Sequence, residues 1–523
     1  MIVVGLSWMA GFEYLREIAR KPFVLNGLMY SNSVRPEQLS QISEEGFLQT
    51  AKWTEIESVN EKNLLAAGKE LFKHQCSSCH TLGGYNDIIS RTDNLTERGL
   101  EAHLTGQGKV LNYMPPFSGT SEEKKALAAY IYRDIHEKEP LKEKPARIHT
   151  VENEIPTFDP ENDKYVILSW NDLGMHCISD NDQFFSFLPP ANTLWAQVVK
   201  RAPRPEVITE GITIKYKVEK QHQNPEDHVP FWDYEEKIFN AALKEGTGLT
   251  GKRVNGEFDL KAAKLSYVAE FIPVTPYRDD GNFNPYPLFT VTAYKEGTGE
   301  KLAQTKVVAP TSTEMGCRNC HGGDWRINNY SGLSDETAQN ILQVHDRLNH
   351  TDLLKKAHNG EPMLCQSCHG DPAVGAKGKK DVLNFSAAVH GFHANYLTNM
   401  KEGSCSLCHP ADPDGNTSCN RGRHSAVGLN CTDCHGTLED HAYALLKNEK
   451  STKPEKASRL MAYLEPRKVA SGEEVHPRTP WLKEPDCLSC HQNFSKPGKV
   501  FKADAFNKWV AGGDVLYRNR PDN

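Results

Sequence analysis

The sequence predicts a multidomain protein with a small α-helical domain, an antiparallel β-sandwich and a mostly irregular, partly α-helical C-terminal domain. Three observations support this fold class. Residues 60–139 carry apolar side chains at helical spacing, a central region alternates apolar and polar residues, and the last third repeats one Cys-x-x-Cys-His phrase. The length of 523 residues allows about three domains of ordinary size. We place an N-terminal anchor helix and linker at residues 1–50, the helical domain at residues 51–140, the β-sandwich at residues 160–312 and the C-terminal domain at residues 313–523.

The repeated phrase occurs five times in the C-terminal region and once in the helical region. Two cysteines three apart can each bond a haem vinyl group, and the next residue, histidine, then faces the iron. A zinc site would need a second ligand pair for each first pair and would leave the trailing histidine unexplained. The sequence therefore predicts six covalently bound haem c groups. They are attached through Cys76 and Cys79, Cys317 and Cys320, Cys365 and Cys368, Cys405 and Cys408, Cys431 and Cys434, and Cys487 and Cys490, with His80, His321, His369, His409, His435 and His491 as iron ligands.

Composition agrees with a haem-rich chain and excludes one class of partner. Only 38% of the residues are apolar, and haem groups would supply the missing apolar bulk. The formal net charge is −7, and no basic stripe is present, which argues against nucleic acid as a partner. The resemblance to c-type cytochromes implies attachment outside the cytoplasmic membrane. We therefore expect an exported, membrane-associated protein on the periplasmic side, with the extracellular face as a further possibility.

The N-terminal segment combines an apolar run with an amphipathic one. Residues 1–12 are apolar and are followed by alternating charged and apolar residues up to Lys21. The apolar run is shorter than the about 20 residues that span a bilayer. We interpret it as a membrane-associated anchor, with a longer upstream helix or an ordinary core helix as alternatives. Residues 16–25 and 29–32 resemble the exit of a transmembrane helix in relatives of cytochrome bd-type quinol oxidase subunits. That resemblance implies a quinol-oxidising membrane subunit as a partner.

The small helical domain is predicted from two helices that flank a loop. The first runs into Cys76, with apolar residues on one side. The second opens with Thr120 as N-cap and Glu123 three residues later, which is a capping-box pattern. The apolar positions are Leu64, Leu65, Leu71 and Phe72 in the first helix, and Leu127, Tyr130, Ile131 and Ile135 in the second.

Between these helices lies the run Tyr113-Met-Pro-Pro-Phe117. The whole of residues 60–139 resembles a class I cytochrome c, in which a methionine before proline supplies the second axial ligand. The resemblance implies that Met114 ligates the iron of the His80 haem; the alternative is a buried gap-filling side chain. A His/Met iron has a higher potential than a His/His iron, so this domain would be the oxidising end of an internal chain.

The β-sandwich is predicted from alternation of period two. The alternating runs are residues 212–218, 265–271 and 289–293, and Glu296-Gly-Thr-Gly299 is typical of a hairpin turn. One phrase in this region stands apart: Asn171-Asp-Leu-Gly-Met-His-Cys177. It ends in Cys177, which together with Cys419 is left over from haem attachment.

That phrase belongs to a wider resemblance. Together with Val344-His-Asp346, Leu364–His369, Val389-His-Gly391 and Cys419-x-Arg-Gly422, it resembles a family of bacterial multihaem cytochromes over residues 160–495. The likeness implies an electron-transfer role and gives no substrate. The chain departs from the pattern in having His424 where we would expect a methionine. Short helices are expected near residues 335–356 and 439–447, and residues 450–484 are expected to be irregular.

Distal ligands are predicted from histidines within the family-like phrases. Six of the 21 histidines belong to motifs, so the other fifteen easily supply five more ligands. The phrases favour His176, His345, His390, His393 and His424. The alternatives are His350, His358, His441 and His476, and the sequence does not pair any of them with a particular haem.

Two classes of function remain in competition. The first is a relay in which every iron is six-coordinate. It would pass electrons from a quinol-oxidising membrane subunit to a periplasmic or extracellular acceptor, with other redox proteins as partners. The second is a reductase or oxidase whose one open iron binds nitrite, hydroxylamine, a sulfur oxyanion or peroxide. All six motifs are of the ordinary Cys-x-x-Cys-His type, which favours the relay and leaves enzymatic activity open.

The two leftover cysteines also permit several interpretations. In an exported protein they are more often paired than free, so we expect a Cys177–Cys419 bridge. The alternatives are two buried thiols, Cys177 as a thiolate ligand of haem, and a copper site at Met175, His176 and Cys177.

Overall fold

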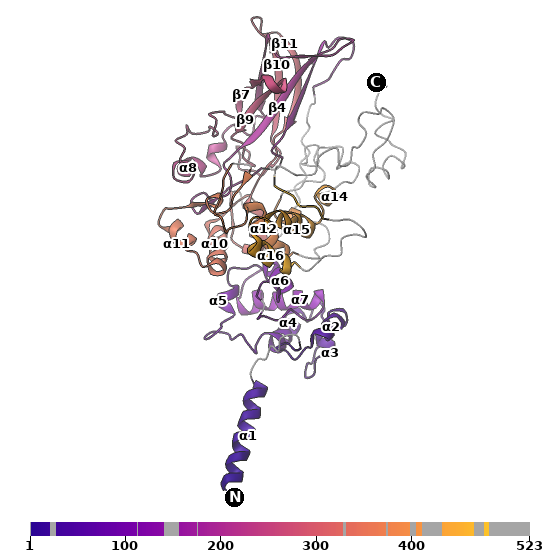
Figure 1. Ribbon diagram of the computed structural model, residues 1–523, viewed down its shortest axis with the longest axis vertical. Helices are drawn as coiled ribbons and strands as arrows, with labels where there is room; N and C mark the ends of the chain where they lie inside the picture. The colour runs from indigo at the N-terminus through magenta and orange to yellow at the C-terminus, as the bar shows by residue number, and fades with distance from the viewer. Residues whose placement is uncertain are drawn as a thin grey trace, which may run out of the picture. The chain divides into compact units, whose positions relative to one another are not determined.

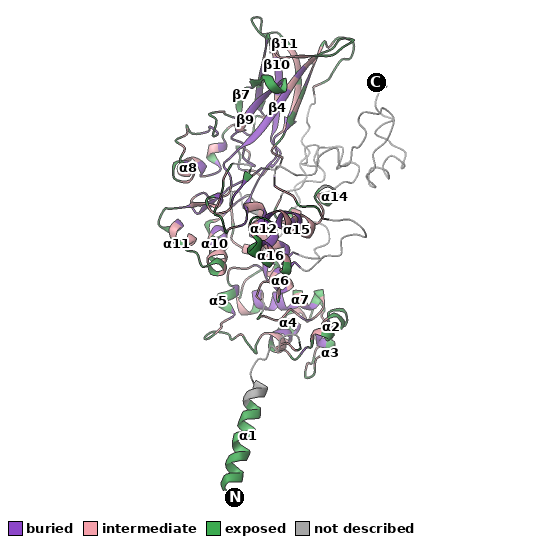
Figure 2. Ribbon diagram, viewed as in Figure 1, coloured by how far each residue is buried: buried purple, intermediate pink, exposed green. Residues whose placement is uncertain are grey.

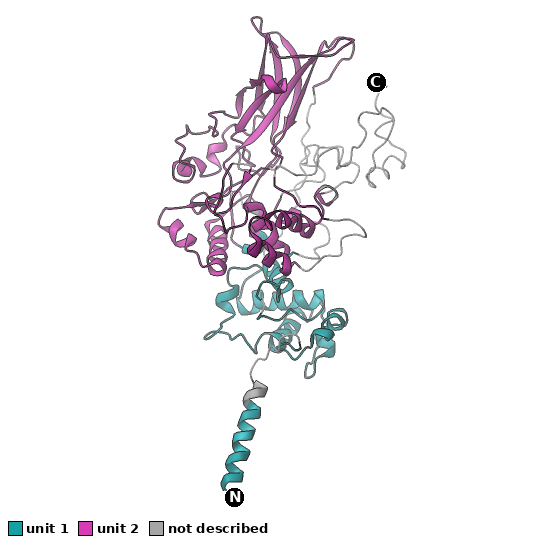
Figure 3. Ribbon diagram, in the orientation of Figure 1, with its two compact units in different colours: residues 1–143, 319–322, 395–399 teal, residues 144–318, 323–394, 400–523 magenta. Residues whose placement is uncertain are grey.

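The computed structural model describes the chain in two compact units (Figure 3). The first unit contains residues 1–143 with 319–322 and 395–399, and the second contains residues 144–318, 323–394 and 400–523. The residues that the structure describes are 2–20, 28–111, 113–140, 156–174, 176–327, 331–372, 375–397, 404–409, 431–464 and 475–480.

The first unit begins with helix α1, Ile2–Arg20. Its described side chains are exposed (Figure 2), including Trp8 at 76% and Met9 at 70%. Within the described ranges, no helix has the length and apolar character needed to cross a membrane. The helix therefore presents an apolar surface that nothing in the described chain covers.

The rest of the first unit is a helical domain. The helix predicted before Cys76 is confirmed as α4, and the capped helix as α7, which continues into the π-helix η2. The capping box is also confirmed, since Thr120 Oγ1 accepts from the Glu123 amide at 3.2 Å and Glu123 Oε2 accepts from the Thr120 amide at 2.9 Å. The elements are η1 Pro36–Gln38, α2 Leu39–Glu45, α3 Phe47–Thr50, α4 Leu64–Gln75, α5 Ile89–Thr92, α6 Glu97–Thr105, α7 Ser121–Ala129 and η2 Tyr130–Ile135.

Helices α4 and α7 pack at a glycine. A Cβ atom on Gly68 would lie 2.1 Å from the Ala126 carbonyl oxygen, so the two backbones approach too closely for any side chain there. Phe72 and Tyr130 pack beside this crossing with ring centroids 5.8 Å apart. The same core includes Phe47 and Leu48 of α3, so residues that the sequence assigned to a linker contribute core side chains.

The second unit contains two antiparallel sheets that share one core (Figure 1). The predicted alternating runs are confirmed as strands β6, β9 and β10, with a tight turn after Lys295. The alternation arises because buried residues such as Ile214 and Tyr216 face the core between exposed lysines. One sheet has the order β1 Tyr165–Asn171, β4 Asn192–Lys200, β9 Ser266–Ile272, β8 Asp259–Lys261, with β5 Glu206–Ile208 also on β4. The other has the order β11 Lys301–Val308, β10 Leu288–Lys295, β6 Ile212–Val218, β7 Asn255–Glu257.

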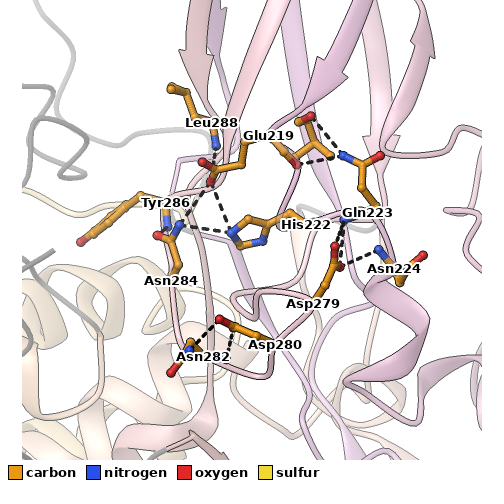
Figure 4. A network of polar contacts seen from close by, with 11 residues as sticks. Glu219, His222, Gln223, Asn224, Asp279, Asp280, Asn282, Asn284, Tyr286 and Leu288 are labelled. Atoms are coloured by element: carbon orange, nitrogen blue, oxygen red, sulfur yellow. Dashed lines mark hydrogen bonds and ion pairs between the residues drawn. The ribbon is translucent and has the colours of Figure 1, made fainter. Parts of the chain in front are cut away.

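The long loops of the sheets gather at one end. Strands β1, β6, β9 and β11 end there, and β4 and β10 begin there. Figure 4 shows one polar network in these loops, where Asn284 Nδ2 donates to His222 Nε2 at 3.1 Å and to Glu219 Oε1 at 3.3 Å. Burial lowers the pKa of His222 to about 3, which favours the neutral imidazole. Its ring is held by the hydrogen bond from Asn284 in the neighbouring loop. The loops also contain η3 Pro225–Asp227, α8 Phe231–Phe239 and η4 Ala262–Lys264.

The remainder of the second unit consists of short elements between the Cys-x-x-Cys-His motifs. Helices are confirmed near residues 335–356, where His350 at φ 55° separates two of them, and near residues 439–447. The elements are β2 His176–Ile178, β3 Phe185–Ser186, β12 Thr311–Thr313, η5 Glu314–Cys317, α9 Arg318–His321, β13 Trp325–Ile327, β14 Ser331–Leu333, α10 Asp335–Asn349, α11 Leu353–His358, β15 Met363–Leu364, η6 Cys365–Ser367, α12 Phe385–Ala394, η8 Cys405–Leu407, α14 Cys431–His435, α15 Leu438–Glu449 and α16 Pro454–Tyr463.

One prediction about this region is wrong. Residues 450–484 were expected to be irregular, but α16 spans Pro454–Tyr463. Proline at the first helical turn is preorganised for a helix and lacks only an amide that would have no partner there. Apolar residues recur after it at helical spacing, at Ala457, Leu460, Met461 and Leu464, and the first and last of these are buried. The helical pattern was therefore present in the sequence and was overlooked among the charged residues around it.

The buried apolar side chains of the motif region are of only two types. Beyond residue 313, the described chain buries only alanines and leucines among its apolar residues, whereas the sheets bury Ile, Val, Tyr and Phe. The described part of this region therefore buries no aromatic or β-branched apolar side chain of its own. This composition is what covalently attached haem groups would complete.

Candidate haem sites

Three of the motifs form the same closed turn. In each, the amide of the second cysteine donates to the carbonyl of the first at 3.0–3.2 Å, and the histidine amide donates to that carbonyl at 2.8–2.9 Å. The turn brings both thiols and the following imidazole close together, as thioether attachment with axial ligation requires. The residues therefore fit haem c. The three copies are Cys76–His80, Cys365–His369 and Cys405–His409.

The motif histidines are held in the state that binds a metal. The Nδ1 atom of His369 lies 2.9 Å from the Leu383 carbonyl oxygen, and that of His80 lies 3.3 Å from the Asn86 carbonyl oxygen. A ring that donates through Nδ1 keeps its Nε2 lone pair free for a metal. Burial lowers the pKa of His80, His369 and His409, which favours the neutral, ligating form.

The other three motifs are described less completely. His321 ends the short helix α9, and α14 consists of the motif Cys431–His435 itself. The Cys434 side chain and the whole motif Cys487–His491 lie outside the described residues.

Met114 lies in the loop that the sequence assigned to it. The side chain is half-buried, and the Met114 amide donates to the Leu111 carbonyl at 3.0 Å. Four residues later, Ser118 is tied to Gln75 by two hydrogen bonds of 2.7 and 3.1 Å. Because Gln75 directly precedes Cys76, the loop is fastened next to the motif. Ligation of iron by Met114 stays a prediction.

His345 lies near a motif histidine. Its ring centroid is 6.4 Å from that of His369, with an angle of 82° between the ring planes. Metal–imidazole bonds are about 2 Å long, so two imidazoles on opposite sides of one metal have ring centroids roughly 6 Å apart. The His345 Nδ1 atom lies 3.0 Å from the Thr351 hydroxyl, which leaves Nε2 for a metal. The sequence placed His345 among the distal ligands, and this geometry supports that role.

His390 has the same relation to another motif histidine. Its ring centroid lies 6.3 Å from that of His409, and the two ring planes are 16° apart. His390 and His393, both on α12, direct Nδ1 to the carbonyls of Ser386 and Val389 at 2.8 Å. The Nε2 atom of His393 is therefore left for a metal. The iron that His393 would ligate is not indicated by the described contacts.

His176 is held differently from these histidines. Its Nε2 atom lies 3.0 Å from the Pro189 carbonyl oxygen, and burial lowers its pKa to about 4. Ligation by His176 would therefore use Nδ1, and it stays a prediction. His424 lies outside the described residues, as does Met175 of the alternative copper site. Among the residues with a described placement, no group of three or more His, Cys, Asp or Glu side chains could hold a metal ion.

The loop after the Asn171–Cys177 phrase holds the chain that leads into two motifs. Strand β2 pairs in parallel with β12, which ends four residues before Cys317. Strand β3 pairs in parallel with β15, which ends directly before Cys365. Between the two strands, the amides of Asp180 and Asn181 donate to the Glu314 carboxylate at 2.9 and 3.2 Å. The phrase therefore marks a structural support for motifs far away in the sequence.

A buried carboxylate completes this support. Asp180 accepts from Arg326 at 2.6 Å, from the Tyr277 hydroxyl at 2.8 Å and from the Leu333 amide at 2.7 Å. Sequence reasoning missed Asp180 and Glu314. The signal for Asp180 was the polar run Ser179-Asp-Asn-Asp182, which is unusual between two apolar segments and which is buried in the structure.

Cys177 lies beside Ser312 in this support. Burial, the Glu314 carboxylate and the Cys408 thiol all raise the pKa of Cys177, so the neutral thiol is favoured over a thiolate. Cys177 forms no disulfide with any cysteine whose position is described. Cys419 lies outside the described residues, so the Cys177–Cys419 bridge stays a prediction.

The helical domain and its motif define a class of protein, a cytochrome c domain. Residues 63–131 match the family model of cytochrome C oxidase, cbb3-type, subunit III. This part of the chain is thus a cytochrome c domain similar to that subunit, and it implies at least one covalently bound haem c with a role in electron transfer. Comparison with curated proteins and with solved structures found no match.

Proposed function

We propose that the chain is a hexahaem c-type cytochrome that relays electrons from a membrane-linked donor to a periplasmic or extracellular acceptor. One observation carries the proposal: the rings of His369 and His409 each lie as far from a second histidine ring as is expected for two imidazoles on one iron. Two such ligands leave no open position for a substrate. That arrangement suits electron transfer better than a reductase or oxidase.

In this proposal, the residues have three roles: they attach the haem groups, ligate the irons or support the motifs. Haem c supplies one-electron chemistry at its iron. The motif cysteines fix its position covalently, and the neutral histidines hold the coordination sphere. The β2–β12 and β3–β15 pairs, with Glu314, keep two of the motifs in place. If Met114 ligates the iron of the first domain, that haem has the highest potential and accepts electrons from the others.

Low-temperature EPR of the oxidised protein tests this function. If every iron has two strong axial ligands, the spectrum should contain only low-spin ferric signals, and added nitrite, hydroxylamine or peroxide should leave it unchanged. A high-spin signal of about one haem per chain that responds to such a substrate would instead support the competing class, a multihaem enzyme.

We also propose that α1 associates the protein with a membrane next to a quinol-oxidising subunit. The exposed apolar side chains of Ile2, Trp8 and Phe12 support this, as does Arg16, about one turn beyond Phe12, because cationic side chains favour anionic lipid surfaces. Deleting residues 2–20 should move the protein from the membrane fraction to the soluble fraction. Arg16→Gln alone should weaken membrane binding less than the deletion does, and its effect should be smaller at high salt, because salt screens the attraction to anionic lipids. Equal sedimentation of the deleted and complete chains with membranes would contradict this role.

A further inference from the structure

His441 lies in the first turn of α15, among histidines of two haem-attachment motifs. Its ring centroid lies 4.7 Å from that of His390 and 5.8 Å from that of His435. His441 Nδ1 is buried and has no hydrogen-bond partner within the described chain. A buried imidazole nitrogen without a partner in the described chain is a candidate for a further ligand.

Two motifs meet at this histidine. The Cys405 and Cys431 side chains are within hydrogen-bonding distance of each other, so the attachment points of two haem groups are adjacent. The motif histidines of the same two copies, His409 and His435, both lie in the cluster. Four imidazoles thus follow one another as neighbouring rings, in the order His409, His390, His441 and His435. Two irons with two axial ligands each would require four imidazoles.

The positions of the two distal rings are fixed by packed helices. His390 is on α12 and His441 is on α15, and these helices lie against each other (Figure 1), with Gly391 facing the Leu446 side chain. Thr437 caps α15 directly after the motif, since its Oγ1 accepts from the Asp440 amide at 3.3 Å. This cap sets where α15 begins and therefore where His441 lies relative to His435.

The distances assign the ligands. The ring centroid of His390 lies 6.3 Å from that of His409. His441 is therefore left as the partner of His435, and the centroids of these two rings are 5.8 Å apart. Both values agree with the roughly 6 Å expected across one metal. Building on the proposed function, we propose that His441 is the distal ligand of the haem bound at Cys431–His435, and that α12, α15 and the two motifs form a unit of two adjacent haems.

The two irons of this unit should differ in electronic structure. The ring planes are 16° apart for His390 and His409 but 89° apart for His435 and His441. Parallel imidazoles donate into the same iron d orbital and split the two π-type orbitals, which gives a rhombic low-spin EPR signal. Perpendicular imidazoles donate into different orbitals and leave them nearly degenerate, which gives a highly anisotropic signal with a large maximal g value. His345 and His369, at 82°, should give a second signal of the anisotropic kind.

The test is His441→Gly in the complete, haem-loaded protein, with EPR and a pyridine haemochrome count on the same sample. We expect six haems per chain, loss of one of the two anisotropic signals, a new high-spin signal of one haem, and recovery of a low-spin signal with added imidazole. The control is His350→Gly, because His350 is exposed and has a positive φ that glycine adopts freely. It should match the wild type.

A second variant covers the case in which His441→Gly does not mature. In His441→Met the thioether should keep one iron six-coordinate and raise the midpoint potential of that haem alone. The inference is overturned if His441→Gly retains six haems and the wild-type EPR spectrum, or if His441→Met leaves every midpoint unchanged. Fewer than six haems in the wild-type protein would overturn the proposed function instead.

Discussion

Expressed without the cytochrome c maturation machinery, the chain should not accumulate as a folded, soluble protein. The motif region buries only alanine and leucine among its apolar residues, in the part that the structure describes, so it depends on haem to complete its core. Recovery of soluble full-length chain should fall several-fold or more. The measurement is the soluble yield and protease resistance in one host, with and without the maturation genes.

The same host with maturation restored is the control for this experiment. A haem-free chain that is soluble, resists protease across residues 313–523 and melts cooperatively would show that the region has a sufficient core of its own. That result would remove the physical argument that links its composition to haem.

Replacing Met114 by histidine should lower the potential of one haem and leave the others in place. Imidazole stabilises the ferric iron relative to a thioether, and axial ligands set haem potentials over a range of about 0.8 V, so a large shift is expected. A redox titration followed in the visible spectrum measures it. Met9→His is the matched control, because Met9 lies on the exposed surface of α1.

Unchanged midpoints in Met114→His would show that Met114 only fills space in the loop. The first domain would then lose its role as the oxidising end of the relay. The Gln75–Ser118 hydrogen bonds would in that case be a support for the loop alone.

Local patterns were sufficient to predict the elements with strong periodicity. Helix α4 leads into its motif, α7 begins at its capping box, and β6 alternates buried and exposed residues as its sequence does. Helix α16 was missed although Ala457, Leu460 and Met461 stand at helical spacing, because the segment around them is rich in charged residues. The boundary of the helical domain was placed too narrowly to include Phe47 and Leu48, whose burial depends on contacts with residues far along the chain.

The site could be predicted only as far as chemistry is encoded in short phrases. The spacing of each motif identifies its two cysteines and its proximal histidine. The distal ligand depends on tertiary packing, which the spacing does not encode. His345 and His390 lie in recognisable phrases, whereas His441 does not, and its position depends on how α15 packs against α12. The parallel pairing of β2 with β12 and of β3 with β15 is likewise invisible in the sequence, because it joins segments far apart in the chain.

The central claim is that this chain carries six covalent haems, and a pyridine haemochrome assay combined with the mass of the denatured protein tests it most directly. The account predicts six haems per polypeptide and a mass increase of six haem groups that survives denaturation. A haem count below six, or a single haem confined to residues 63–131, would contradict it.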